Sequence, residues 1–192
     1  MTGRGPSTTS TSPRTGSSIC NVTRLEVLRP FVEQTVKEFL GVEELKVLDD
    51  GTIPIRSGSS AVNVRLLEGP AGGHPLLQVS SPLLHGVASS PELLEKLNDM
   101  NAGFSFARAF LAGDTVCIAM ELFAEELTEE QISYACGLIT FAADHWDDEL
   151  KRTFGGQTFF EGYPADESPP DPTAGTGVDP TAEAAADSGG YL

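Results

Sequence analysis

The sequence predicts an α+β domain with the element order αβββαββα and a mainly antiparallel sheet. Three observations support this fold class. Apolar residues recur at three- or four-residue spacing in three segments, which is typical of amphipathic helices. Between these segments the period changes to two, which is typical of strands buried on one face. The strands are joined by short connections rich in Gly, Ser and Pro, which favour hairpins and therefore antiparallel pairing.

The first helix is expected in residues 23–40. Its start, Thr23 to Glu26, fits a capping box, and Gly41 provides a stop. Pro30 lies inside the apolar pattern of this segment. Because proline cannot donate a helical hydrogen bond, Pro30 either kinks the helix or marks its true first turn.

Three short strands are expected next, near residues 52–56, 62–68 and 77–83, as a meander. In the first of them, Ile53 and Ile55 alternate with more polar residues. Pro54 has no backbone N–H to give to a ladder, so this strand is expected at an edge of the sheet.

The second helix is expected to begin at Pro91, with Ser89 or Ser90 as its cap and Gly103 as its stop. We interpret Asn101 as a C-terminal cap of this helix. Asn98 is less easily explained, since Asn is a mediocre helix former, and it is a candidate to bond a neighbouring strand or a bound backbone.

A hairpin follows, with strands near residues 104–111 and 115–123 joined by Gly113-Asp114, a pair typical of a type II′ turn. Its register puts Leu111, Val116, Ile118 and Met120 on one face. The opposite face carries Phe104, Phe106, Phe110 and Phe123, together with Arg108 and Glu121. A capping box from Thr128 to Gln131 then opens the longest helix, which Gly155-Gly156 ends.

Composition divides the chain into a disordered N-terminal tail (1–20), one domain (21–156) and a disordered acidic tail (157–192). The net charge is −16, and the segment from Gln157 onward holds seven acidic residues and no Lys or Arg. Such a surface repels phosphate, so neither nucleic acid nor an anionic membrane is an expected partner. The acidity serves solubility or, alternatively, a preference for basic segments.

The three cysteines, Cys20, Cys117 and Cys136, form no CxxC pair, and the last two lie in a strand and on an apolar helix face. This usage favours reduced thiols and the cytoplasm. The sequence has no apolar run of the length that crosses a bilayer. We therefore expect a soluble, unexported protein.

No catalytic centre is expected. Gly103 to Ala107 approximates a nucleophile elbow, but it leads from a helix into a strand, so Ser105 is interpreted as an ordinary strand residue. His145 and Glu149 have the spacing to face one cation, yet a solvated acidic helix end explains them, and no second cluster would complete a coordination shell. Phosphate-binding glycine motifs do not occur in the sequence. We expect neither a metal nor a cofactor, and no enzyme.

The phenylalanines of the hairpin are the strongest functional signal, because a sheet face over water is normally polar. Either a helix or loop wraps over this face, or it binds a partner, which would be a second copy of the chain or a peptide. The candidate partner-binding residues are Ile53, Ile55, Phe104, Phe106, Arg108, Phe110 and Phe123.

Several segments together resemble the YbjN family: Pro91 to Leu94, the LNxxN-like element from Leu97 to Asn101, the hairpin, Leu127 to Gln131, and Ala143 to Leu150. YbjN-like domains are similar in fold to the class I (CesT-type) secretion chaperones of type III systems. The resemblance spans about residues 22–154 and implies a non-enzymatic module that binds extended peptide or protein clients, often as a homodimer. It adds no catalytic residues.

Two functions are the leading hypotheses, and a small hydrolase or a metal enzyme that uses His145 is a third. The first is a chaperone-like module that binds a client by addition to the first strand and by apolar contacts near the phenylalanines. The second is a regulatory or scaffold protein whose domain dimerises and whose disordered acidic tail is the active part.

Overall fold

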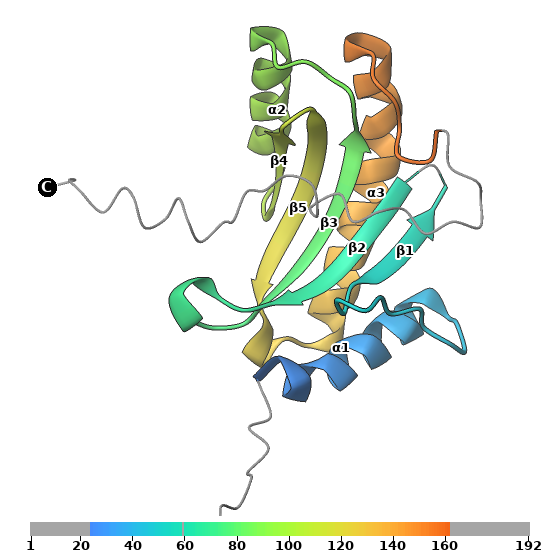
Figure 1. Ribbon diagram of the computed structural model, residues 1–192, viewed down its shortest axis with the longest axis vertical. Coiled ribbons are helices and arrows are strands. Elements are labelled where there is room, and N and C mark those ends of the chain that lie inside the picture. Colours follow the sequence, from blue (N-terminus) through green and yellow to red (C-terminus); the bar gives the residue numbers. More distant parts are fainter. Residues whose placement is uncertain (1–23, 59, 162–192) are drawn as a thin grey trace, which may run out of the picture.

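A five-stranded antiparallel sheet in the order β1-β2-β3-β5-β4 forms one layer, and three α-helices form the other (Figure 1). The computed structural model describes residues 24–58 and 60–161. The elements are α1 (Arg24–Leu40), β1 (Ile53–Ser57), β2 (Ser60–Leu67), β3 (Leu76–Leu84), α2 (Pro91–Gly103), β4 (Ala107–Ala112), β5 (Thr115–Phe123) and α3 (Glu129–Phe154). The predicted fold class and element order are confirmed.

The core lies between the sheet and α3, which runs behind β2, β3 and β5 (Figure 1). α1 packs on α3, and α2 packs on β4. The alternating inward residues of the strands, such as Val64, Val79 and Ile118, are fully buried against Ile132 and Ile139 of α3. Burial of each such side chain contributes about 1.5–3 kcal/mol, so this two-layer contact stabilises the domain.

α1 retains Pro30 in its interior. The alternative that Pro30 marks the first turn is therefore wrong, because the helix already begins at Arg24. The ring is tolerated because Pro30 is exposed, so the lost backbone hydrogen bond is on the wet side of the helix. Gly41 takes a φ of 64°, which suits the expected stop. Thr23 lies outside the described residues.

The β4–β5 hairpin has the predicted register, with Ala109 opposite Ile118 and Phe110 opposite Cys117. Its first strand is shorter than expected, however, because it starts at Ala107 and not at residue 104. The Phe104 N–H donates to the Asn101 carbonyl at the end of α2, so Phe104 belongs to the helix end. The step from helix to strand takes residues 104–106.

Ordered structure continues past residue 156, where the domain was expected to end. His85 at the end of β3 and Gln157 exchange two backbone hydrogen bonds, of 2.9 and 3.0 Å. Thr158 and Phe159 are buried. The predicted boundary is thus wrong for residues 157–161, because two adjacent aromatic residues supply apolar surface that the composition of the tail hides. The predicted tail 1–20 and the part of the predicted tail 157–192 that follows residue 161 lie outside the described residues.

Candidate functional site

The sheet face opposite α3 is the candidate binding surface and is called the outer face below. In the described part of the chain, all three helices pack on the other side of the sheet (Figure 1). The strand residues of the outer face, read from the register, are Pro54, Arg56, Ala61, Asn63, Arg65, Leu67, Leu76, Gln78, Ser80, Pro82, Arg108, Phe110, Ala112, Thr115, Cys117, Ala119, Glu121 and Phe123.

The middle of the outer face is polar. Glu121 accepts hydrogen bonds from Gln78 at 3.0 Å and from Arg108 at 2.6 and 3.2 Å. Burial acts to raise the pKa of Glu121, but the hydrogen bonds from Arg108 and Gln78 and the charge of Arg108 outweigh it and lower that pKa. Arg108 also lies 4.8 Å from the centre of the Phe110 ring. The interpretation of this face as mostly apolar therefore needs correction, because β2 and β3 contribute polar and small residues.

The four phenylalanines of the hairpin differ in exposure. Phe106 and Phe123 are 68% and 70% exposed, whereas Phe104 packs against the core and Phe110 is half-buried beside Arg108. Phe110 and Phe123 project from opposite ends of the outer face, since Phe110 pairs with Cys117 and Phe123 lies six positions after Cys117, about 20 Å along the strand. The phenylalanines do not form one cluster.

Ile53 and Ile55 lie at the other edge of the sheet from Arg108 and Phe110. Their side chains are 3% and 5% exposed and belong to the core. Four strand spacings, about 19 Å, separate β1 from β4. The structure therefore separates the predicted residues into two edge regions and an exposed corner at Phe123.

β1 is an edge strand, as Pro54 predicted. Ser57 pairs with Ser60 to close the β1–β2 hairpin, and hydrogen-bonded pairs alternate along the ladder from this closing pair. This parity turns the backbone groups of Ile53 and Ile55 toward β2, and those of Pro54 and Arg56 toward the outer edge. The edge residues that sequence analysis missed are thus Pro54 and Arg56, which the length of the hairpin turn could have identified.

The β4 edge is different because a side chain already occupies it. The Asn101 side chain accepts from the Ala109 N–H at 2.6 Å and donates to the Ala109 carbonyl at 2.9 Å. Asn101 therefore bonds β4 as a neighbouring strand would, and its interpretation as a helix cap is wrong. The hydrogen bonds to a neighbouring strand that were considered for Asn98 are made by Asn101.

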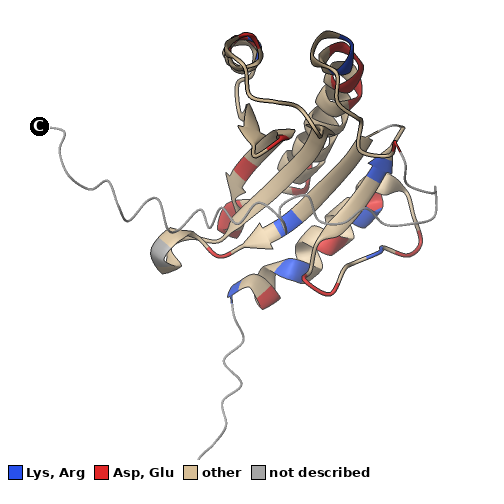
Figure 2. Ribbon diagram, turned by 45° about the horizontal axis from the view of Figure 1, so that its top comes forward, with Lys and Arg blue, Asp and Glu red and all other residues tan. Residues whose placement is uncertain are grey.

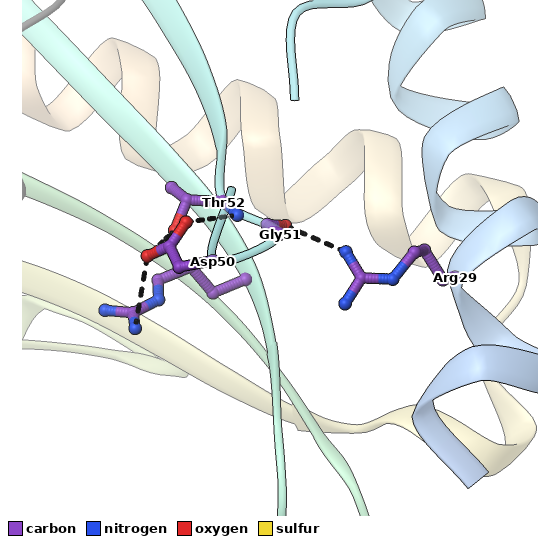
Figure 3. Close-up of polar contacts among 5 residues, drawn as sticks. Arg29, Asp50, Gly51 and Thr52 are labelled. Carbon is purple, nitrogen blue, oxygen red and sulfur yellow. Dashed lines mark hydrogen bonds and ion pairs between the residues drawn. The ribbon is translucent and has the colours of Figure 1, made fainter. Parts of the chain in front are cut away.

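Polar contacts in the preceding loop fix the start of β1 (Figure 3). The Asp50 carboxylate accepts from the Thr52 N–H at 2.9 Å and from its hydroxyl at 2.8 Å, and it forms an ion pair with Arg65 of β2. The hydrogen bond from the Thr52 N–H, with help from the Thr52 hydroxyl and Arg65, lowers the pKa of Asp50. Arg29 of α1 donates to the Gly51 carbonyl at 3.4 Å.

The end of the described chain reaches the same edge. Phe160 lies against Arg56, with the guanidinium carbon 4.2 Å from the ring centre. Gly156 passes so close to β3 that an added Cβ would lie 2.7 Å from Leu84 Cδ2 and 2.8 Å from the His85 carbonyl oxygen. Figure 1 shows this segment returning from the end of α3 toward the β1–β2 end of the sheet.

The residues considered for chemistry lie apart from one another. His145 stacks on Phe141 and meets Trp146 edge-on, and no group of three or more metal-ligating side chains occurs within residues 24–58 and 60–161. Burial raises the pKa of the Cys117 and Cys136 thiols to about 11 and about 12. Among the described helices, none has the length and apolar character needed to cross a membrane.

Comparison with known proteins gives a family. Residues 26–162 match the family model TY-Chap1, described as "T3SS (YopN, CesT) and YbjN peptide-binding chaperone 1". No curated protein matches the sequence significantly. Among solved structures, a chain of the ExsC–ExsE complex superposes with a TM-score of 0.52 at 14% identity, covering 66% of this chain and 96% of that one.

The Yersinia pestis type III secretion chaperone SycH, solved with a stable fragment of YscM2, has a TM-score of 0.43 at 17% identity. The alignment covers 59% of this chain and 98% of that one. The ExsC–ExsE likeness supports the fold seen here, and the family match covers nearly all of the described residues. The chain belongs to the family of T3SS and YbjN peptide-binding chaperones.

Proposed function

We propose that this protein binds an extended segment of a client protein along the β1 edge, with client side chains reaching onto the outer face. The observation that carries the proposal is the difference between the two sheet edges. Asn101 bonds the outward backbone of β4 at Ala109, whereas β1 turns the backbone of Pro54 and Arg56 toward the edge. Addition of a strand is therefore favoured at β1.

The side chains around β1 suit a client that carries acidic and apolar residues. Arg56 and Arg65 project from neighbouring strands of the outer face, and basic segments are visible on β1 and β2 in Figure 2. Leu67, Leu76 and Phe123 form one row across β2, β3 and β5 at the far end of this face. The buried thiols Cys117 and Cys136 suit a reducing cytoplasm, where such a client would be met.

The test begins with a displayed library of random 12-residue peptides, selected on the full-length protein. The peptide that is enriched is synthesised and titrated into isotope-labelled protein, and amide shifts are followed by NMR. We expect the shifts to concentrate at Arg56, at Ser57 and on the outer face. Shifts confined to the outward surface of α3, near Tyr134 and Phe141, would contradict the proposal.

A pair of variants separates backbone from side-chain binding. Arg56→Pro removes the N–H that the register turns to the edge, whereas Arg56→Ala keeps this N–H and removes only the guanidinium. We expect Arg56→Pro to weaken peptide binding at least about tenfold, because the hydrogen bond from the Arg56 N–H to the peptide is lost and the proline ring obstructs the added strand. Arg56→Ala is expected to have the smaller effect.

The regulatory alternative, in which the domain dimerises and the acidic tail acts, makes a different prediction. Sedimentation of the full-length protein would then give a dimer, and the selected peptide would leave the amide signals of β1 unchanged.

A further inference from the structure

We propose that the C-terminal segment 162–192 of the same chain docks on the outer face beside β1 and competes there with the client. The competition rests on the proposed function, whereas the docking does not. The contacts of residues 155–161 carry it, because they determine where the segment starts.

The described chain ends at the β1 side of the sheet and is held there. The His85–Gln157 backbone pair, the buried Phe159 and the Phe160 ring against Arg56 fix residues 157–161. The Glu161 carboxylate accepts from the Thr158 N–H at 3.2 Å and forms an ion pair with Lys151. Residue 162 therefore leaves from a fixed point next to Arg56, an outer-face residue of the edge strand.

The segment is long enough to cross the face from that point. Residues 162–192 span about 100 Å when extended, and the sheet is about 19 Å wide between β1 and β4. A tether this short holds its far end at an effective concentration in the millimolar range, so even a weak contact is occupied. Intramolecular docking thus needs little intrinsic affinity.

Charge on the outer face also complements the segment. Residues 162–192 carry six acidic residues and no Lys, Arg or His, on a protein whose net charge is −16. The strand residues of the outer face carry Arg56, Arg65 and Arg108 against the carboxylate of Glu121. Asp50, in the loop before β1, pairs with Arg65 at 3.7 Å, so these groups together carry one net positive charge. In a protein of net charge −16, they attract the acidic segment that starts beside Arg56.

The same features identify the segment as a competitor of the client. A client strand added to β1 would lie beside Arg56, where residue 161 ends, and would meet Arg56 and Arg65 with its own side chains. Both ligands need the same arginines and the same edge, so the segment must be displaced before the client binds.

Docking is tested by paramagnetic relaxation in the full-length chain. A nitroxide is attached at Ser188→Cys in a Cys20→Ser background, and the raised pKa of the buried thiols Cys117 and Cys136 keeps them unreactive at neutral pH. We expect broadening of outer-face amides such as Asn63, Gln78 and Ala119, and none at Tyr134 or Phe141 on α3. Uniform or absent broadening would overturn the proposal.

A matched variant removes the charge and keeps the length, with all six acidic residues changed to their amides. These are Asp166, Glu167, Asp171, Asp179, Glu183 and Asp187. We expect this change, or 0.5 M NaCl, to abolish the broadening, because a screened or neutral segment loses the attraction. Broadening that appears when labelled protein is mixed with spin-labelled protein would indicate docking between two copies and would also overturn the proposal.

Competition is measured with the peptide selected above. We expect the neutral-segment variant to bind this peptide about tenfold more tightly than the wild type, as expected when a tethered competitor at millimolar effective concentration is removed. If the segment docks but no peptide binds at β1, the proposed function fails and the docking stands. If the peptide binds at β1 with equal affinity in both proteins, the competition fails alone.

Discussion

Replacing Asn101 by Ala should release the outward edge of β4. The substitution removes the two hydrogen bonds, of 2.6 and 2.9 Å, that the side chain makes with the Ala109 backbone. Because Asn101 is exposed, each of these hydrogen bonds should contribute less than about 1 kcal/mol to stability, about 1.5 kcal/mol for the two together. Alanine is the better helix former by about 0.5 kcal/mol, which leaves a loss of roughly 1 kcal/mol in the free energy of unfolding.

The expected loss is measurable in two ways. Urea unfolding should show the lower stability directly, and thermal unfolding should show a melting temperature lower by about 3–4 °C for a domain of this size. Hydrogen exchange should show a larger local effect, since the Ala109 N–H loses its acceptor. The freed edge should also pair with other molecules, so sedimentation should detect self-association that grows with protein concentration.

Two variants on the same helix control the experiment. Asn98→Ala makes the same chemical change at an exposed position three residues away and should be neutral or slightly stabilising. Asn101→Asp keeps an acceptor for the Ala109 N–H and loses the donor to the Ala109 carbonyl. Its loss of stability should therefore be about half of that expected for Asn101→Ala. If Asn101→Ala unfolds like the wild type and Ala109 stays protected from exchange, the assigned sealing of this edge is refuted.

Three further predictions concern other contacts. The pKa of the Glu121 carboxyl is lowered in the folded state, so its contacts stabilise the fold at pH values above its unfolded pKa of 4.5, and this stabilisation is lost as the pH falls through the folded pKa. Glu121→Gln should therefore unfold at a lower urea concentration than the wild type at pH 7. Equal stability at pH 7 would count against the Arg108 and Gln78 contacts. Gly156→Ala, which combines a φ of 81° with a Cβ 2.7 Å from Leu84, should release the Gln157 amide to exchange. Gly155→Ala has open space at its Cβ and should lose only the strain energy of its backbone conformation (φ 73°, ψ −149°), about 1–3 kcal/mol. Cys117 and Cys136 should resist a thiol reagent at pH 7.5 until urea unfolds the protein, and rapid reaction of more than one thiol per native chain would contradict their burial.

Sequence reasoning succeeded where a local signal fixes the geometry. The Gly113-Asp114 turn set the parity of the hairpin, and the pairs Phe110–Cys117 and Leu111–Val116 follow from it. The N-terminal caps at Ser90 and Thr128 were likewise readable, because the capping residue and its partner lie within one turn of helix.

It failed where a contact depends on how distant elements pack. Nothing near Asn101 in the sequence reveals that the end of α2 lies beside the middle of β4, so its bonds to Ala109 were missed. Residues 157–161 were assigned to a tail on composition, although Phe159 and Phe160 could have signalled an apolar anchor. Phe104 was placed on a strand face because periodicity alone does not show where a helix end stops and a strand begins.

The two sheet edges suggest how a strand-binding surface is kept from binding copies of itself. An edge that accepts a client strand also accepts the edge of another molecule, and proteins limit this with short strands, proline and charge. Asn101 occupies the outward backbone groups of Ala109 in the middle of β4, while β1 is only five residues long and has Pro54 at an outward position, where it offers a carbonyl and no N–H. Such an edge offers an added strand the N–H of Arg56 but none at Pro54, so side chains such as Arg56 and Arg65 add selectivity to a short backbone contact. On this argument Pro54→Val should increase self-association of the protein more than it increases binding of the selected peptide, and sedimentation beside peptide titration would measure both. A larger gain for the peptide than for self-association would show that Pro54 does not protect the edge.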